Sequence, residues 1–123
     1  SNFIMQALRG EHLTIYGDGM QTRSFCYVDD QVDGLIKLLN SNYQFPINIG
    51  NPSEINMLEL TKLVGKYSGK DIEVVHQPLP VDDPVKRCPD ISLAKKILKW
   101  EPKIEISQGL NLTIDWFRSC LDE

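Results

Sequence analysis

An arginine in a proline-stiffened loop is the residue whose type and setting point most directly to chemistry. Arg87 lies in the segment DDPVKRCP, residues 82–89, where no helical pattern accounts for a cation. A guanidinium stays charged and can bind a carboxylate through two parallel hydrogen bonds. Arg87 is therefore singled out as a candidate functional residue. The alternative is an internal salt bridge to Asp82 or Asp83 that only holds the loop.

A second arginine follows a glycine-rich turn. Arg23 comes shortly after the GDG sequence at residues 17–19. Its guanidinium suits phosphate, because the planar fork of N–H groups matches phosphate oxygens. The alternative is a solvated surface cation.

Most familiar catalytic motifs are absent from the sequence. The eight glycines build neither GxGxxG nor GxxxxGK[ST], no tyrosine is followed four residues later by lysine, and GxSxG and HExxH are missing. The three cysteines form no CxxC pair, and only two histidines are present, so no metal site is predicted. We expect Cys26, Cys88 and Cys120 to be reduced structural thiols.

The composition is that of an ordinary globular domain. The 123 residues are 41% hydrophobic and 24% charged, with a net charge of −4. The acidic balance gives no support to nucleic-acid binding. No apolar run approaches the ~20 residues of a membrane span, and residues 1–6 have no character of a secretion signal. These features predict a cytoplasmic protein with neither a nucleic-acid nor a membrane partner.

Short extended runs surround the candidate arginines. They alternate or are rich in β-branched residues, and glycine or proline bounds them. The predicted extended elements are residues 13–16 before the 17–19 turn, 24–28, 47–49 ending at Gly50, and 72–76, and residues 77–90 are predicted to be a loop.

Helical periodicity marks the other segments. The predicted helices are residues 3–9 closed by Gly10, a helix from Asp29 with Asp29 or Asp30 as its cap, residues 56–68 before Gly69, residues 92–98 capped by Ser92, and a last helix capped by Ser107. In the second of these, Val32, Leu35, Ile36 and Leu39 share one apolar face. In the last, Leu110, Ile114 and Phe117 are predicted to point inward. The order predicts a mixed α/β domain in which helices outnumber strands.

Three segments carry a resemblance to a known family. They are LTIYGDGMQTRSFCYVDD at 13–30, DDPVKRCPDI at 82–91 and AKKILKWEP at 94–102. Together they resemble the C-terminal part of the extended short-chain dehydrogenases that act on nucleotide sugars, and above all the UDP-glucuronate decarboxylases, which make UDP-xylose. The first segment is shared with 4,6-dehydratases and 4-epimerases, whereas the second is more typical of the decarboxylases. The resemblance covers nearly the whole chain.

The resemblance implies an α/β fold in which residues 1–123 are the single sugar-nucleotide-binding C-terminal domain of a Rossmann-type enzyme, without its dinucleotide-binding half. In the family NAD oxidises the sugar C4 hydroxyl, the β-keto acid loses its carboxylate, and the ketone is reduced again. The NAD-binding glycine motif and the Tyr-x-x-x-Lys base of the family are not in this sequence. The chain alone is therefore expected to be inactive. The alternatives are a dTDP-glucose 4,6-dehydratase or UDP-sugar 4-epimerase relative, or a non-catalytic nucleotide-sugar-binding module.

The resemblance also assigns roles to individual residues. Arg87 matches an arginine that faces the sugar near the leaving carboxylate, and it is the candidate catalytic residue. Arg23 matches a position on the substrate diphosphate. The remaining predicted substrate-binding residues are Asn2, Thr14, Tyr16, Gln21 and Asn48, each with structural packing or a turn as its alternative. A UDP-sugar is the implied ligand, and the apolar strand predicted at 47–49 favours a homo-oligomer, because an unpaired strand edge recruits another chain.

Overall fold

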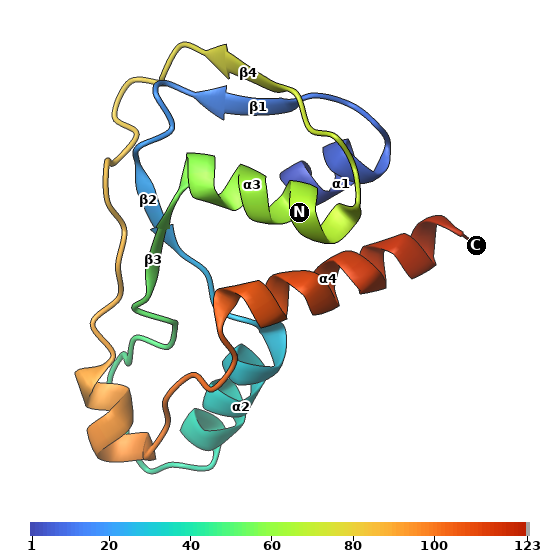
Figure 1. Cartoon of the computed structure of the whole chain (residues 1–123). Coiled ribbons are helices and arrows are strands. Elements are labelled where there is room, and N and C mark those ends of the chain that lie inside the picture. The colour runs from blue at the N-terminus through green and yellow to red at the C-terminus, as the bar shows by residue number, and fades with distance from the viewer. Residues whose placement is uncertain (123) are drawn as a thin grey trace.

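The structure, a computed structural model, describes residues 1–122 and consists of helices joined by short strands (Figure 1). No helix among these residues is both long enough and apolar enough to cross a membrane. The elements in chain order are α1 Asn2–Leu8, β1 Leu13–Tyr16, β2 Thr22–Ser24, α2 Val28–Leu39, β3 Glu54–Asn56, α3 Met57–Ser68, β4 Val74–Gln77, the π-helix η1 Ala94–Leu98, and α4 Ile106–Leu121.

The strands form two separate pairs. β1 pairs in parallel with β4, from Leu13 opposite Val74 to Tyr16 opposite Gln77. β2 pairs antiparallel with β3, with Arg23 opposite Ile55. In Figure 1 the β1–β4 pair lies over α1 and α3, whereas α2 and η1 lie at the opposite end of the molecule, and β2 and β3 run between the two ends.

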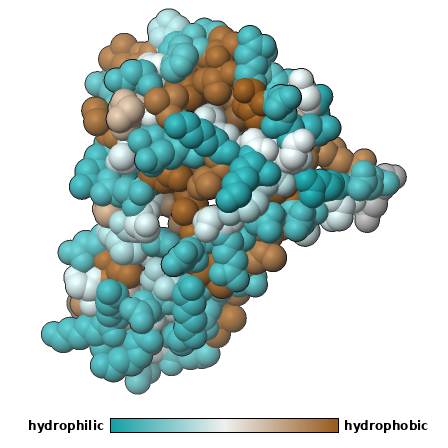
Figure 2. Space-filling view, viewed as in Figure 1, coloured by the Kyte–Doolittle hydropathy of each residue, from teal (hydrophilic) through white to brown (hydrophobic). Residues whose placement is uncertain are grey.

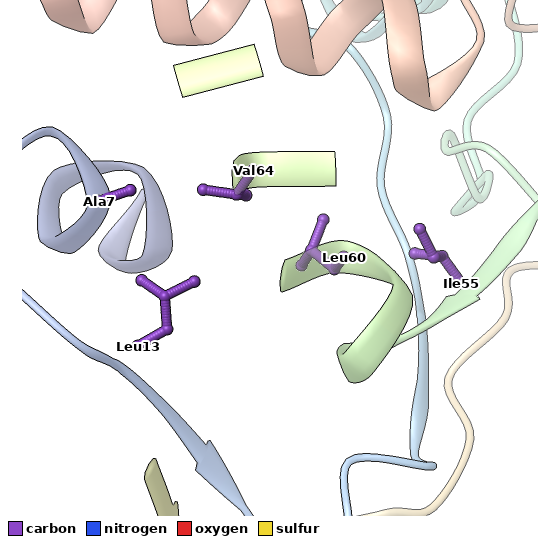
Figure 3. Close-up of a cluster of buried hydrophobic side chains, with 5 residues drawn as sticks. All are labelled: Ala7, Leu13, Ile55, Leu60 and Val64. Atoms are coloured by element: carbon purple, nitrogen blue, oxygen red, sulfur yellow. The ribbon is translucent and has the colours of Figure 1, made fainter. Parts of the chain in front are cut away.

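Each end of the molecule has its own buried cluster. Figure 3 shows Ala7, Leu13, Ile55, Leu60 and Val64 gathered between α1, β1 and α3. The second cluster surrounds Trp100, which is buried together with Ile91, Ala94 and Leu98. The site described below lies on the segments that connect these two clusters.

Helix α3 is the element that local sequence specifies best. The Asn56 side chain accepts a hydrogen bond from the Glu59 N–H, and the Glu59 carboxylate accepts one from the Asn56 N–H, which is a reciprocal capping box. Gly69 ends the helix with φ 69°, a left-handed conformation that glycine adopts without a Cβ clash. The predicted helix at 56–68 is confirmed, as are the helix closed by Gly10 and the strand at 13–16.

The predicted strand at 47–49 is wrong. Within residues 1–122 this segment pairs with no other strand. Ile47 and Ile49 instead pack against the Trp100 cluster, and Asn48 between them is exposed. The apolar side chains of this segment are thus covered in part by the Trp100 cluster and not by a neighbouring strand.

Several predicted boundaries also move. Helix α2 begins at Val28 after Tyr27, so Asp29 and Asp30 lie in its first turn and do not cap it. The residue before helix α4 is Glu105, so Ser107 lies inside the helix and does not cap it. Before η1, the Ser92 hydroxyl and N–H both donate hydrogen bonds to Asp90. The extended runs predicted at 24–28 and 72–76 are strands at Thr22–Ser24 and Val74–Gln77.

The predicted apolar face of α2 is present, but it is not buried. Val32, Leu35, Ile36 and Leu39 are all exposed, and Leu39 reaches 82%. The buried residues of this helix are Asp30 and Gly34, on its other side. In the last helix, by contrast, Ile114 is fully buried as predicted, with Leu110 and Phe117 half-buried.

Candidate functional site

The two candidate arginines lie on adjacent segments, although 64 positions separate them in the sequence. The Thr22 N–H donates to the Val85 carbonyl at 2.9 Å, and the Ser24 hydroxyl donates to the Arg87 carbonyl at 3.1 Å. Thr22 also forms an isolated parallel bridge with Lys86. We call this arrangement, β2 with residues 83–87 beside it, the arginine strip. It brings Arg23 and the Arg87 loop together.

Arg23 is engaged by the loop itself. Its Nη2 donates to both carboxylate oxygens of Asp83, at 3.0 and 3.1 Å, and its Nη1 donates to the carbonyls of Thr22 and Pro84, at 2.7 and 2.9 Å. Nη1 thus has two carbonyl acceptors, and Nη2 makes both of its contacts with a single carboxylate. The end of the guanidinium that was predicted to bind phosphate therefore faces Asp83.

Arg87 differs from its cationic neighbours in the strip. Arg23 pairs with Asp83, and Lys86 pairs with Glu54 at 3.2 Å. Arg87 is exposed, and its side chain has no ion pair or hydrogen bond within residues 1–122. The predicted alternative, a salt bridge from Arg87 to Asp82 or Asp83, is not formed, because Asp83 is taken by Arg23. The strip therefore carries one positive charge that the described residues do not neutralise.

Glu54 helps to hold the other edge of the strip. Its carboxylate accepts a hydrogen bond from the Thr22 hydroxyl at 2.7 Å. This bond, followed by the interaction with Lys86, lowers the pKa of Glu54 below its ordinary value. Sequence reasoning did not single out Glu54 or assign Asp83 to Arg23, because both partners are distant in the sequence from the residues they contact.

The residues predicted to border a nucleotide base lie at the end of β1. Tyr16 is exposed and Thr14 is half-buried. Gln21 is buried, and its Nε2 donates to the Tyr16 carbonyl at 2.8 Å, which closes the turn between β1 and β2. On the opposite strand the His76 Nδ1 lies 2.8 Å from the Gly17 carbonyl. Gln21 thus has a structural function, while the side chain of Tyr16 is open to a ligand.

Asn48 lies at the far end of the Arg87 loop. Its Nδ2 donates to the Asp90 carbonyl at 3.3 Å. The hydrogen bonds from the Ser92 hydroxyl and N–H lower the pKa of Asp90 below its ordinary value. Asn48 and Arg23 therefore both hold residues of the same 83–90 segment, at its two ends.

Asn2 is separated from the other predicted residues. It lines a largely apolar cavity of about 500 Å³ between α1, α3, the start of α4 and the segment 25–28. Of the predicted site residues, Asn2 alone lines this cavity. Cys26 also lines it, and burial together with the nearby charge of Asp30 raises the pKa of its thiol. The cavity and the arginine strip are therefore two distinct places on the molecule.

The described residues do not fit a dinucleotide. A bound pyrophosphate usually rests on a glycine-rich loop that leads from a strand into a helix N-terminus. Here the GDG turn leads from β1 into β2, another strand. No three His, Cys, Asp or Glu side chains within residues 1–122 are grouped to hold a metal ion.

Comparisons with known proteins agree with the resemblance seen in the sequence. Residues 1–50 match the model of the NAD dependent epimerase/dehydratase family. UDP-glucuronic acid decarboxylase 3 of Arabidopsis thaliana is 53% identical over 122 residues, which is 99% of this chain and 36% of the relative. The chain thus spans about a third of the length of this curated relative.

Solved structures of nucleotide-sugar enzymes are also similar to this chain. UDP-glucose 4-epimerase from Thermotoga maritima, determined with UDP-glucose, aligns with a TM-score of 0.91 and 36% identity, over 97% of this chain and 38% of that chain. UDP-glucuronic acid 4-epimerase from Bacillus cereus, determined with UDP-glucuronic acid and NAD, aligns with a TM-score of 0.88 and 31% identity, over 97% and 39%. The α/β fold class and the resemblance to nucleotide-sugar enzymes are confirmed.

Proposed function

From the homology to UDP-glucuronic acid decarboxylases, we propose that residues 1–123 are the sugar-nucleotide-binding domain of an enzyme of this kind. Its reaction converts UDP-glucuronate to UDP-xylose and CO2 in the cytoplasm. Redox chemistry in this reaction belongs to NAD, which is held by parts of such enzymes that this chain does not match. The homologue at 53% identity supports the assignment, and so does the structural neighbour determined with UDP-glucuronic acid and NAD.

The observation that carries the proposal is the unneutralised charge of Arg87. UDP-glucuronate is anionic at the diphosphate and at the carboxylate on C5. In the arginine strip Asp83 and Glu54 neutralise Arg23 and Lys86, and Arg87 remains for a substrate anion. A guanidinium binds a carboxylate through two parallel hydrogen bonds, so Arg87 is suited to hold the group that leaves.

Arg87 can also act after the carboxylate leaves. The bond between C5 and the carboxylate breaks, CO2 departs, and the electron pair remains in an enolate. A proton must then be added at C5. Because a guanidinium keeps its proton in proteins, Arg87 acts by ordering a water that supplies this proton.

The other residues position the substrate. Thr14 and Tyr16 at the end of β1 border the base, and Arg23 binds the diphosphate. Asn2, Gln21 and Asn48 complete the proposed set; the bond of Gln21 to the Tyr16 carbonyl gives it an indirect role.

Substitution of Arg87 tests the proposal. We would place this chain in the Arabidopsis thaliana decarboxylase in exchange for the segment it matches, and measure UDP-xylose by chromatography. Arg87→Lys should reduce turnover at least about tenfold with an unchanged melting temperature, because an ammonium cannot reproduce the two parallel bonds. Lys86→Arg, the adjacent cation, is the matched control and should retain turnover. Near-normal decarboxylation by Arg87→Lys, or a loss of stability as its only effect, would refute the role of Arg87.

A 4-epimerase is the second candidate, because both solved neighbours above are 4-epimerases. The same chromatogram separates the two, since epimerisation of UDP-glucuronate retains the carboxylate and releases no CO2. The 123-residue chain by itself should produce neither product with NAD and UDP-glucuronate, because its sequence lacks the glycine motif and the Tyr-x-x-x-Lys pair. Binding of UDP-glucuronate with no turnover in the chimera would favour a non-catalytic module.

A further inference from the structure

The loop that carries Arg87 has little apolar packing of its own. Val81 is 90% exposed and Val85 is 72% exposed, and Lys86, Arg87 and Cys88 are exposed as well. Asp82 has a φ of 67°, so the chain makes a turn there, with the Asp83 N–H donating to the Pro80 carbonyl at 3.3 Å. A segment with so few buried contacts needs polar contacts to stay in one place.

The strongest of these polar contacts is at Asp83. Its carboxylate receives two hydrogen bonds from one nitrogen of Arg23, and the side chains of the pair are only 29% and 21% exposed. The same guanidinium binds the Pro84 carbonyl, the next residue along the loop. Charge-assisted hydrogen bonds in partly buried positions are stronger than neutral ones. Arg23 and Asp83 thus fasten the loop to β2 four residues before Arg87.

We propose that Asp83 is a positioning residue that acts through Arg23 to hold Arg87 at the arginine strip. This inference rests on the proposed function, in which Arg87 binds the substrate carboxylate. Beyond Asp83 the loop keeps the same register, because Thr22 binds Val85 and Ser24 binds the Arg87 carbonyl. All three residues of β2 therefore contact the loop, and the ion pair of Arg23 with Asp83 is the contact that lies earliest in the loop.

An alternative role for Asp83, as a competitor of the substrate for Arg23, predicts a different kinetic effect. If Asp83 only occupies Arg23 until the substrate diphosphate replaces it, Asp83 competes with substrate. Removing its charge would then free Arg23 and lower KM. If Asp83 positions Arg87, removing its charge loosens the loop and lowers kcat. The sign of the effect therefore decides between the two roles.

The first measurement is hydrogen exchange of the Thr22 amide in the 123-residue chain. This amide is bonded to the Val85 carbonyl, so its exchange reports whether the loop is in place. Asp83→Asn should accelerate exchange by about tenfold or more, because a charge-assisted bond to a partly buried group is lost. Asp82→Asn is the matched control: Asp82 has no ion pair within residues 1–122, and asparagine tolerates its positive φ. Equal exchange in the two variants would overturn the proposal.

The second measurement is the kinetics of the chimera described above. Asp83→Asn should lower kcat about tenfold to a hundredfold with a smaller change in KM, as expected when a reacting group is misplaced. Asp83→Glu, which keeps the charge, should recover part of this loss, and Asp82→Asn should behave as the parent. A lower KM with kcat retained would overturn the proposal. If the parent chimera makes no UDP-xylose, the proposed function fails, and the exchange of Thr22 still decides whether Asp83 holds the loop.

Discussion

Helices α2 and α3 are each 12 residues long and amphipathic, but they use their apolar faces in opposite ways. In α3, Val64 is 1% exposed and Leu60 joins it in the buried cluster under β1 (Figure 3). In α2, Val28, Val32, Leu35 and Leu39 follow one another at intervals of four, three and four residues, the spacing of a helix-packing stripe, yet all four are exposed. Figure 2 shows small apolar patches among hydrophilic residues on the lower part of the molecule, where Figure 1 places α2.

The attachment of α2 to the rest of the chain runs through its other side. The Asp30 carboxylate accepts the N–H groups of Lys103 and Ile104, at 3.0 and 2.9 Å, and the Asp30 carbonyl accepts the Trp100 indole N–H at 3.0 Å. Gly34 lies against Ile49 and Trp100. A hydrophobic stripe thus identifies the face of a helix that is favourable to bury. Whether that face is buried depends on which other elements of the chain pack against it.

The largest expected effect concerns association. The exposed stripe of α2 should draw copies of the 123-residue chain together as concentration rises, because contiguous apolar surface is buried on contact. Sedimentation velocity at several concentrations should show this, and the double variant Leu35→Glu with Leu39→Glu should be monomeric. Lys62→Glu on the exposed side of α3 serves as the control and should associate as the parent does. A parent chain that stays monomeric at all concentrations would contradict the prediction.

Truncating one leucine in each helix sharpens the comparison. Leu60→Ala in α3 should lower the free energy of unfolding by about 2–5 kcal/mol, because it leaves a cavity in the core. Leu39→Ala in α2 should change it by less than about 0.5 kcal/mol in the monomer, since Leu39 is exposed. Urea unfolding at low protein concentration measures both variants. Similar losses would show that the α2 stripe is covered within a single chain.

A glycine in each helix provides a smaller test. A Cβ on Gly34 of α2 would lie 2.6 Å from Ile49 Cγ2 and 3.1 Å from Trp100, whereas on Gly65 of α3 it would lie 3.1 Å from Ile72. Alanine gains about 1 kcal/mol of helix propensity in either position, but overpacking costs about 1–3 kcal/mol. Gly34→Ala should therefore destabilise the chain, and Gly65→Ala should be close to neutral. Thermal unfolding distinguishes them, and a stabilised Gly34→Ala would disprove the tight packing of α2 on Trp100.

The smallest expected effect is the dependence of stability on pH. Asp90, beside the Trp100 cluster, and Glu54, beside α3, both have a lowered pKa in the folded chain. A carboxyl whose folded pKa is lowered adds stability above its unfolded pKa and loses it as pH falls. The unfolding midpoint should therefore decline slightly as pH falls below about 4.5, the ordinary pKa of Glu54. Asp90→Asn and Glu54→Gln should each flatten the decline in part, and an unchanged slope in both variants would contradict the assignment.

The sequence predicted those parts of the fold whose causes are local. The helix that starts at Asn56 and ends before Gly69, the helix closed by Gly10, and the strand at 13–16 depend on neighbouring residues and were correct. The strand at 47–49 was wrong because its apolar residues fit two environments, a sheet and a packed irregular segment. Local pattern does not distinguish the two.

The candidate site divides in the same way. Guanidinium chemistry and the resemblance to the decarboxylases together marked Arg87 and Arg23, and both can be recognised in the sequence. The tertiary structure determines which acidic residue pairs with each arginine. Asp83 lies 60 positions from Arg23, and only the pairing of β2 with the loop brings them together. That contact leaves Arg87 without an acid within residues 1–122. A sequence determines which side chains are charged and which are apolar. Long-range packing decides which charges are paired and which apolar side chains are buried, because those contacts join residues distant in the chain.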